Sequence, residues 1–214
     1  MRVIEAIKNN AIILIARGIP DDKLVNAAEA AFQGGIRSME VTFIQNGDPE
    51  DTANAIRRLR GAFGGELLVG AGTVMTEDQA KLARQAGALY AVSPNTDERV
   101  IKACKRLGLI SIPGAFTPSE VALAYSLGAD MVKVFPADIG GPAYIRALKG
   151  PFAHIPLAAV GGVTPETIRP FYQAGAEAFG VSSGILPMAR ILRADYQEIT
   201  RRARAYMEAL CLKK

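Results

Sequence analysis

Short apolar runs alternate with longer amphipathic stretches along the whole chain. The apolar runs are rich in Val, Ile, Leu and Ala and have the length of buried strands. They predict β-strands at 11–16, 37–43, 67–71, 89–93, 109–112, 130–135, 155–160 and 178–182. Between them, apolar residues recur at helical spacing. This spacing predicts helices at 21–33, 49–62, 76–86, 96–107, 117–126, 141–149, 165–174 and 194–211, with a short helix at 2–9 before the first strand.

Eight strand–helix pairs with short connections predict parallel strands that are joined by right-handed crossovers. Eight such units that close on themselves form a (β/α)8 TIM barrel, an α/β fold, here with a short N-terminal helix. The alternative is an open, doubly wound sheet, but no Gly-x-Gly-x-x-Gly turn follows the first predicted strand. Neither a linker nor a change in composition divides residues 1–214, so we expect a single domain.

Composition and charge narrow the possible functions. The chain has 214 residues, half of them hydrophobic, which is enough for one sizeable core. Its net charge of +4 is spread along the chain, and the basic cluster at 201–204 lies in the last predicted helix. We interpret that cluster as a solvated face and expect no nucleic-acid partner. No apolar run is long enough for a transmembrane helix or a signal peptide, so we expect a cytoplasmic protein that does not bind membranes.

The chain offers few residues that bind metals. Its two cysteines, Cys104 and Cys211, lack the spacing of a metal site. The single histidine, His154, excludes a zinc site made of several histidines. We therefore expect no metal and no other cofactor.

The predicted strand 130–135 carries a lysine, Lys133, in an otherwise apolar run. Strand side chains alternate between the two faces, so Met131, Lys133 and Phe135 share one side. Burial disfavours the charged form of an amine and lowers its pKa, and a neutral amine can form a Schiff base with a carbonyl. The alternatives are a lysine that extends its ammonium group to water, or a structural ion pair. This strand alone does not decide between them.

A second charged residue, Glu40, lies inside the apolar strand 37–43. Ser38, Glu40 and Thr42 share one face, and the other face is apolar and suits packing against helices. Glu40 is therefore expected to face the barrel interior, as Lys133 does. A carboxylate beside an amine can transfer protons during Schiff-base chemistry. The alternative is a buried ion pair, but such a pair is usually only weakly stabilising, so the two charges favour a catalytic function.

Active sites of barrel enzymes form at the carboxyl ends of the strands, and phosphate often binds after the last two. Gly161-Gly162 follows the seventh predicted strand, and Ser183-Gly184 follows the eighth. Glycines let main-chain N–H groups approach an anion, and a following helix N-terminus adds positive potential. Ordinary turns also use these residues, but their position in the barrel favours a phosphate site.

Four further residues are candidates for the pocket: Arg17, Thr73 and Pro94, which follow predicted strands, and Phe135, which ends the strand 130–135. Arg17 could bind a carboxylate or phosphate through two hydrogen bonds, or it could form a surface ion pair. Thr73 could offer its hydroxyl to a ligand, or it could cap a helix. Pro94 and Phe135 could form apolar walls, or they could simply pack in the core.

These residues fall in motifs that resemble the KDPG/KHG aldolases, the pyruvate-dependent enzymes that cleave 2-keto-3-deoxy-6-phosphogluconate and 4-hydroxy-2-oxoglutarate. The matching motifs are Glu40–Phe43, Gly70–Val74, Ser93-Pro94, Ile112–Gly114, Lys133–Pro136 and Gly161–Val163. The resemblance implies a metal-free class I aldolase of Entner–Doudoroff-type carbohydrate metabolism, a homotrimer on a (β/α)8 barrel. It implies that Lys133 forms the Schiff base and that Glu40 is the general acid and base. It places Thr73, Pro94 and Phe135 around pyruvate, and Gly161, Gly162 and Ser183 around phosphate.

The sequence departs from many members of that family at two positions. Ile44 stands where an arginine often reaches the pyruvate carboxylate, and Val160 stands where a threonine often precedes Gly-Gly. Both features, together with Arg17 and the stretches 141–145 and 159–166, resemble the branch that acts on 2-keto-3-deoxy-6-phosphogalactonate. We hypothesise that Arg17 takes over the binding of the anion.

We therefore expect a carbon–carbon lyase that splits a 2-keto-4-hydroxy acid into pyruvate and an aldehyde, either glyceraldehyde 3-phosphate or glyoxylate. The alternatives are an aldolase specific for the galactonate series, a phosphosugar isomerase or epimerase on the same fold, and a barrel that only binds a phosphorylated metabolite. The configuration at C4 of the substrate depends on a few contacts that the sequence does not specify.

Overall fold

The computed structural model describes residues 3–211, and the side chain of Cys211 and residue 2 of the first predicted helix lie outside the described part. In this part of the chain, one parallel sheet curls into a barrel with the strand order β5-β4-β3-β2-β1-β9-β8-β7-β6. The strands are β1 (Ile12–Ala16), β2 (Ser38–Thr42), β3 (Leu68–Gly72), β4 (Tyr90–Val92), β5 (Ile110–Ile112), β6 (Gly114–Ala115), β7 (Val132–Val134), β8 (Leu157–Val160) and β9 (Ala178–Val181).

The barrel closes through a fifth strand that is divided in two. β5 pairs with β4, β6 pairs with β7, and Pro113 lies between them. Pro113 has no N–H to donate to the sheet, but its carbonyl oxygen accepts a hydrogen bond from the N–H of Lys133 at 2.9 Å. The predicted (β/α)8 barrel is confirmed. The open doubly wound sheet is wrong, because neighbouring strands follow one another in chain order around the sheet and the last strand, β9, pairs with the first.

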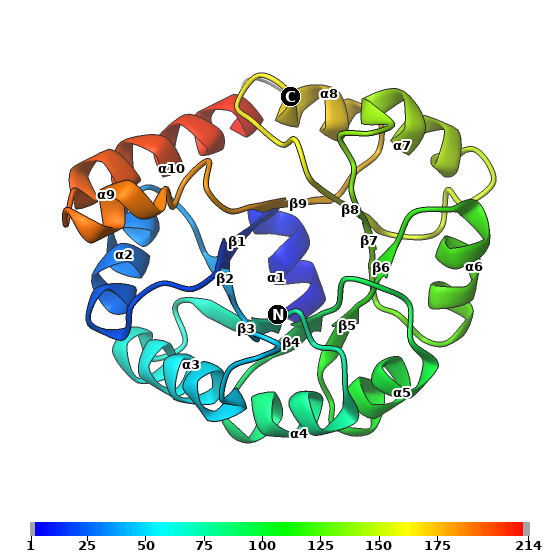
Figure 1. Ribbon diagram of the computed structural model, residues 1–214. Helices are drawn as coiled ribbons and strands as arrows, with labels where there is room; N and C mark the ends of the chain where they lie inside the picture. Colours follow the sequence, from blue (N-terminus) through cyan, green and yellow to red (C-terminus); the bar gives the residue numbers. More distant parts are fainter. Residues whose placement is uncertain (1–2, 212–214) are drawn as a thin grey trace.

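Helices surround the sheet, and one further helix lies at its centre (Figure 1). They are α1 (Val3–Asn10), α2 (Asp21–Gln33), α3 (Pro49–Phe63), α4 (Glu77–Gln85), α5 (Glu98–Arg106), α6 (Pro118–Ser126), α7 (Gly141–Lys149), α8 (Ile168–Gln173), α9 (Met188–Leu192) and α10 (Tyr196–Cys211). α1 lies across the centre of the ring, and its Ile7 packs into the barrel interior. This helix therefore closes the end at which the strands begin and leaves the other end for the site.

The alternation of side chains along the strands produces two apolar clusters. One lies between the sheet and the outer helices and contains Val132 and Val134. The other fills the barrel and contains Met131 and Tyr90. Lys133 lies between Val132 and Val134 in β7, so it faces the interior, as the sequence pattern predicts.

Two elements were not predicted and a third begins three residues later than predicted, while the other bounds shift by at most two residues. β6 appears beyond Pro113, and α9 was not predicted. α8 begins at Ile168 rather than 165, because residues 164–167 form a turn in which Thr164 and Thr167 bond to each other's main-chain N–H groups. Within the described residues, no helix has both the length and the apolar composition that a membrane span requires.

Candidate active site

Lys133 lies on β7 and reaches the open end of the barrel. Its residue exposure is 9 %, and its ammonium nitrogen lies 4.7 Å from the centre of the Phe135 ring. Burial lowers the pKa of Lys133 below its ordinary value, Glu40 opposes this shift, and the positive charge of Arg17 adds to it. The environment therefore shifts Lys133 toward the neutral amine, which is the nucleophilic form.

Glu40 lies on β2 and is 2 % exposed. Burial raises its pKa from 4.5 to about 7, although the positive charges of Lys133 and Arg17 pull it down. Its Oε2 atom is buried and has no hydrogen-bond partner among the described residues. A carboxyl group with a pKa near neutrality can both accept and donate a proton under physiological conditions.

The structural alternative for these two charges was an ion pair that ties two strands together. Among the described residues, no ion pair within 4.0 Å joins Lys133 to Glu40. A small cavity lies between them instead, and apolar side chains from several strands complete its wall: Ile13, Ile15, Val92, Ile112, Ala158 and Val160. The two groups therefore face a common space, and each influences the other's pKa across it.

Gly72, at the end of β3, makes room for the Glu40 carboxylate. A Cβ atom at this position would lie 2.5 Å from Glu40 Oε1 and 2.9 Å from a methyl carbon of Thr42. Glycine at position 72 is thus required for Glu40 to adopt its position over the cavity.

Arg17 and Thr73 meet at the rim, although 56 residues separate them in the sequence. The Arg17 guanidinium donates to the Thr73 hydroxyl at 3.2 Å, and Arg17 forms no ion pair among the described residues. Thr73 has a φ of 55°, a strained conformation for a β-branched residue. The Gln45 side chain donates to its carbonyl oxygen at 3.0 Å. Thr73 does not cap α4, because Thr76 does so.

The loops after β8 and β9 present main-chain N–H groups. Gly161 and Gly162 have positive φ values of 106° and 66°. Within the described residues, the N–H groups of Gly162, Val163, Ser183 and Gly184 donate to no protein acceptor. Unpaired N–H groups at positive-φ turns are typical of anion-binding sites.

Of the nine residues predicted for the site, Glu40 and Lys133 lie within β2 and β7, and the other seven follow the carboxyl ends of strands. Direct contacts link several of the nine. Arg17 contacts Thr73, and Lys133 contacts Phe135. Pro94 has a less direct link: a Cβ at Gly114 would lie 2.2 Å from its carbonyl oxygen, and Gly114 pairs with Lys133 in the sheet. Ser183 is exposed on the loop after β9 and has no recorded contact with Lys133 or Glu40.

Asp138, on the loop after β7, was not among the residues predicted for the site. Its side chain packs so closely on Gly161 and Gly162 that a Cβ at Gly162 would lie 2.5 Å from Asp138 Cβ. Its position as an acidic residue shortly after a predicted strand is a signal that could have identified it. Residues 201–204 were predicted to form one solvated face. Arg201 is exposed as predicted, but Arg202 is half-buried and bonds to the carbonyl oxygen of Gly184.

Residues 3–202 match the family described as "KDPG and KHG aldolase". The chain belongs to this aldolase family. It is 30 % identical to the 2-dehydro-3-deoxy-6-phosphogalactonate aldolase of Escherichia coli (strain K12) over 93 % of this chain and 96 % of that one. It is 33 % identical to the KHG/KDPG aldolase of the same organism over 86 % and 84 % of the two chains.

The fold of this aldolase is also similar to solved structures of the family. One is the KDPG aldolase of Legionella pneumophila with pyruvate captured as a covalent carbinolamine intermediate. It superposes with a TM-score of 0.84 at 26 % identity and covers 95 % of this chain and 97 % of its own. The protein described here is thus a carbon–carbon lyase of the pyruvate-dependent, Schiff-base class.

Proposed function

We propose that this aldolase cleaves a 6-phosphorylated 2-keto-3-deoxy sugar acid into pyruvate and glyceraldehyde 3-phosphate, with Lys133 and Glu40 as the catalytic pair. The observation that carries this proposal is a buried amine and a buried carboxyl group that face one cavity and whose pKa values both move toward neutrality. An amine whose pKa is lowered can act as a nucleophile, and a carboxyl group whose pKa is raised can act as an acid or a base, so the two groups suit one catalytic site.

In this mechanism the neutral amine of Lys133 attacks the C2 carbonyl carbon of the substrate. The carbinolamine loses water and becomes a protonated imine, which accepts the electron pair when the C3–C4 bond breaks. The pocket lowers the pKa of Lys133, so at a given pH a larger share of the amine is neutral than for an exposed lysine. The Phe135 ring below the nitrogen stabilises the cationic imine in the same way as it contacts the ammonium group.

Glu40 serves as base and then as acid. Its carboxylate takes the proton of the C4 hydroxyl as the aldehyde forms, directly or through a water molecule. The same proton then goes to C3 of the enamine, and water releases pyruvate from Lys133. Glu40 Oε2, which has no hydrogen-bond partner among the described residues, is the oxygen atom that can accept the proton of the C4 hydroxyl.

The proposed substrate phosphate binds to the loops that follow β8 and β9. The free N–H groups of Gly162, Val163, Ser183 and Gly184 supply the donors. Thr73, Pro94 and Phe135 enclose the pyruvate portion in this proposal. A phosphorylated substrate also favours a cytoplasmic location for the enzyme.

The galactonate series is our preferred substrate within this proposal. Val160 lines the cavity beside Glu40 and Lys133 and has no hydroxyl group to offer to the substrate. The rim holds Arg17, and the arginine common after the glutamate motif is replaced by the exposed Ile44. The test is to measure pyruvate release from the two C4 epimers of the phosphorylated acid. A kcat/KM higher for the gluconate epimer would contradict the preference, and no release from either would contradict the function.

We expect Arg17→Ala to raise the KM for the phosphorylated keto acid about tenfold or more, with a smaller effect on kcat. The reason is that a charge-assisted contact with a carboxylate contributes roughly 1.5–3 kcal/mol. Steady-state kinetics measure the change, and Arg58→Ala is the control, because Arg58 pairs with Asp21 at the surface. If KM and kcat of Arg17→Ala match those of the wild type, Arg17 does not bind the substrate.

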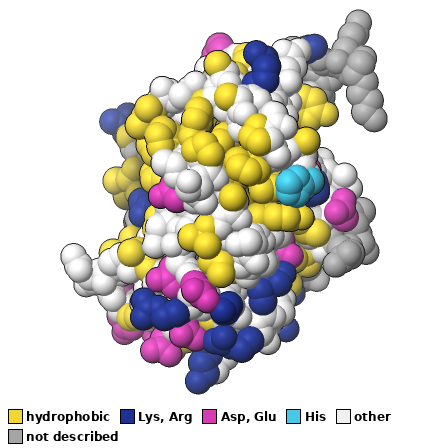
Figure 2. Space-filling view, turned by 90° about the vertical axis from the view of Figure 1, so that its right-hand side faces the viewer, with side chains coloured by type: hydrophobic (Ala, Val, Ile, Leu, Met, Phe, Trp, Pro, Cys, Tyr) yellow, Lys and Arg dark blue, Asp and Glu magenta, His cyan; other side chains and the backbone are white. Residues whose placement is uncertain are grey.

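We also propose that the enzyme is a homotrimer, the state that the family resemblance implies. α6 is apolar on both sides: Val121 and Ala124 are buried, while Leu123 and Tyr125 are 51 % and 38 % exposed. Tyr125 also contacts the His154 ring at 5.4 Å. Hydrophobic side chains gather over the middle and upper part of this face, and charged side chains gather below (Figure 2). An apolar patch of this kind favours self-association.

Light scattering after size-exclusion chromatography is expected to give three times the 22.7 kDa mass of the chain. Leu123→Asp places a charge on the proposed interface and is expected to lower that mass. Leu192→Asp is the matched control, because Leu192 is 59 % exposed on α9, away from α6. A monomer mass for the wild type would contradict the proposal, and an unchanged mass for Leu123→Asp would show that α6 is not the interface.

A further inference from the structure

The C-terminal helix α10 contacts both loops of the proposed phosphate site from behind. Tyr206 reaches the loop after β8, and Arg202 reaches the loop after β9. The two residues are four apart, so they lie on the same face of the helix. A single rigid element thus holds two loops that come from different strands.

Tyr206 is buried, with an exposure of 3 %, and its hydroxyl donates to the carbonyl oxygen of Val163 at 3.0 Å. The same hydroxyl occupies the space beside the other loop. A Cβ at Gly184 would lie 2.2 Å from the Tyr206 oxygen. Glycine at position 184 therefore lets the β9 loop lie directly on Tyr206, and both loops contact one side chain.

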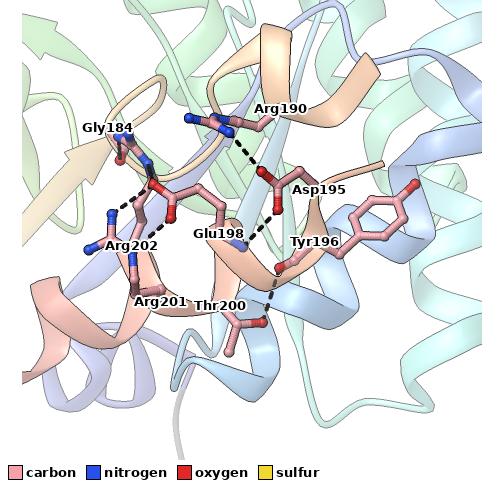
Figure 3. Close-up of polar contacts among 8 residues, drawn as sticks. All are labelled: Gly184, Arg190, Asp195, Tyr196, Glu198, Thr200, Arg201 and Arg202. Atoms are coloured by element: carbon pink, nitrogen blue, oxygen red, sulfur yellow. Dashed lines mark hydrogen bonds and ion pairs between the residues drawn. The ribbon is translucent and has the colours of Figure 1, made fainter. Parts of the chain in front are cut away.

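Arg202 donates to the carbonyl oxygen of Gly184 at 3.1 Å through one nitrogen and to Glu198 at 2.8 Å through another (Figure 3). Glu198 also accepts two hydrogen bonds from Arg201, each at 2.7 Å. The arginines lower the pKa of Glu198 to about 2, so its carboxylate stays charged at physiological pH. The carboxylate fixes the guanidinium plane of Arg202 and aims its free nitrogen at Gly184.

These contacts determine how the loops present their N–H groups. The carbonyl groups held by α10 fix the peptide planes that Val163 shares with Thr164 and Gly184 shares with Ile185, and the N–H groups in these planes bond to Thr167 and Ser182. Fixing these planes limits rotation at Val163 and Gly184, whose own N–H groups remain without protein acceptors among the described residues. Pre-positioned donors bind an anion better than mobile ones, because less ordering has to accompany binding.

We propose that Arg202 and Tyr206 are positioning residues for the substrate phosphate: they act through the carbonyl groups of Gly184 and Val163 and do not touch the substrate. This inference rests on the proposed function of the β8 and β9 loops. It assigns a role in substrate affinity to α10, which contributes no residue to the cavity between Lys133 and Glu40.

The helix supplies its own matched control. Arg201 binds the same carboxylate of Glu198 as Arg202 does, but no contact with a loop is recorded for it. Arg201→Met therefore removes an arginine and two hydrogen bonds without freeing Gly184. Tyr206→Phe removes only the hydroxyl and keeps the ring that fills the space below the loops.

The experiment compares Arg202→Met, Tyr206→Phe and Arg201→Met with the wild type. Two substrates are used: the phosphorylated keto acid and the same acid without phosphate. Inorganic phosphate serves as a competitive inhibitor in both series. We expect Arg202→Met and Tyr206→Phe to raise the KM for the phosphorylated acid and the inhibition constant of phosphate about tenfold. Their kcat/KM for the unphosphorylated acid is expected to stay within about twofold, and Arg202→Lys is expected to restore part of the affinity.

Borohydride trapping of pyruvate on each variant shows that the barrel is folded and that Lys133 still reacts. Equal losses with both substrates, or the same loss in Arg201→Met, would overturn the proposal and leave α10 a purely structural role. If the wild type prefers the phosphorylated acid and the variants keep this preference, the positioning role is wrong, but the phosphate site stands. A wild type without any such preference would contradict the phosphate site as well.

Discussion

Lys133→Met is expected to lower kcat by at least about 10⁴-fold, because the variant lacks the amine that forms the covalent intermediate. Methionine is close to lysine in length and suits the apolar wall around Lys133, so the barrel is expected to fold. The measurement is borohydride reduction in the presence of pyruvate, followed by mass spectrometry of the peptides. We expect a pyruvate-derived adduct on the peptide that contains Lys133 in the wild type and no adduct in the variant.

Lys149→Met is the control for the loss of a partly buried lysine outside the site. Lys149 is on α7 and bonds to the carbonyl oxygens of Ala153 and Ile155 and to Glu177. This variant is expected to lose stability but to keep the adduct on Lys133. No adduct in the folded wild type with excess pyruvate would remove the Schiff-base mechanism from this chain, and an isomerase or a metabolite-binding role would then become the better hypothesis.

Glu40→Gln is expected to lower kcat about 10²–10⁴-fold, the range typical of a lost general acid–base group. Glutamine keeps the shape of the side chain but cannot take the C4 hydroxyl proton. Trapping of pyruvate on Lys133 is expected to persist, because Schiff-base formation at equilibrium does not require carbon–carbon cleavage. If turnover survives in Glu40→Gln, another group supplies the proton.

The pH dependence of the wild type follows from the raised pKa of Glu40. In the proposed mechanism its carboxylate is the base for cleavage, so kcat/KM should fall as the pH drops below about 7. Glu40→Gln lacks this titration, so the part of the acid-side loss that comes from Glu40 should disappear from its residual activity. A pH profile from 5 to 9, measured on both proteins at equal ionic strength, checks the assignment.

The burial of the Glu40 carboxyl group also makes the stability of the folded protein depend on pH. The pKa of Glu40 is 4.5 when it is unperturbed and about 7 in the folded protein. Between these values the folded state holds more protons than the unfolded state, so the contribution of Glu40 to stability falls as the pH rises through this window. At pH 8 the cost is up to about 3 kcal/mol, at 1.36 kcal/mol for each pKa unit.

Glu40→Gln is therefore expected to raise the free energy of unfolding at pH 8 by up to about 3 kcal/mol and to leave it nearly unchanged at pH 4. Urea unfolding at the two pH values measures this difference. Glu198→Gln is the control with the opposite sign, because Arg201 and Arg202 hold the pKa of Glu198 low and the charged form stabilises the fold. A Glu40→Gln variant that is less stable than the wild type at pH 8 would show that the carboxylate is not desolvated as described.

Strand periodicity in the sequence was enough to orient Lys133 and Glu40, the proposed catalytic pair. Side chains alternate along a strand, so the apolar residues beside Lys133 and Glu40 place both charges in the interior, and both line the same cavity in the structure. The repetition of strand–helix units was likewise sufficient for the barrel, because short right-handed connections leave few other arrangements for eight such units. These features depend on local spacing, which a single sequence displays directly.

Other features depended on contacts between distant segments. The sequence named Arg17 and Thr73 as separate candidates, but only the closed barrel brings them to 3.2 Å. Whether Lys133 and Glu40 form an ion pair depended on the distance across the cavity, and the raised pKa of Glu40 depended on complete burial. Neighbours across a barrel are set by strand register and closure, and these are decided by the packing of the whole chain.

The contacts of the last helix, α10, likewise could not be predicted from the sequence. Residues 201 and 202 are both arginines in one basic cluster, and the sequence does not separate them. The docking of α10 leaves Arg201 in solvent and directs Arg202 to the carbonyl oxygen of Gly184. Sequence pattern alone thus determined the barrel and the orientation of its two internal charges. The tertiary structure decided which polar groups meet, because those meetings depend on how helices and strands far apart in the chain pack together.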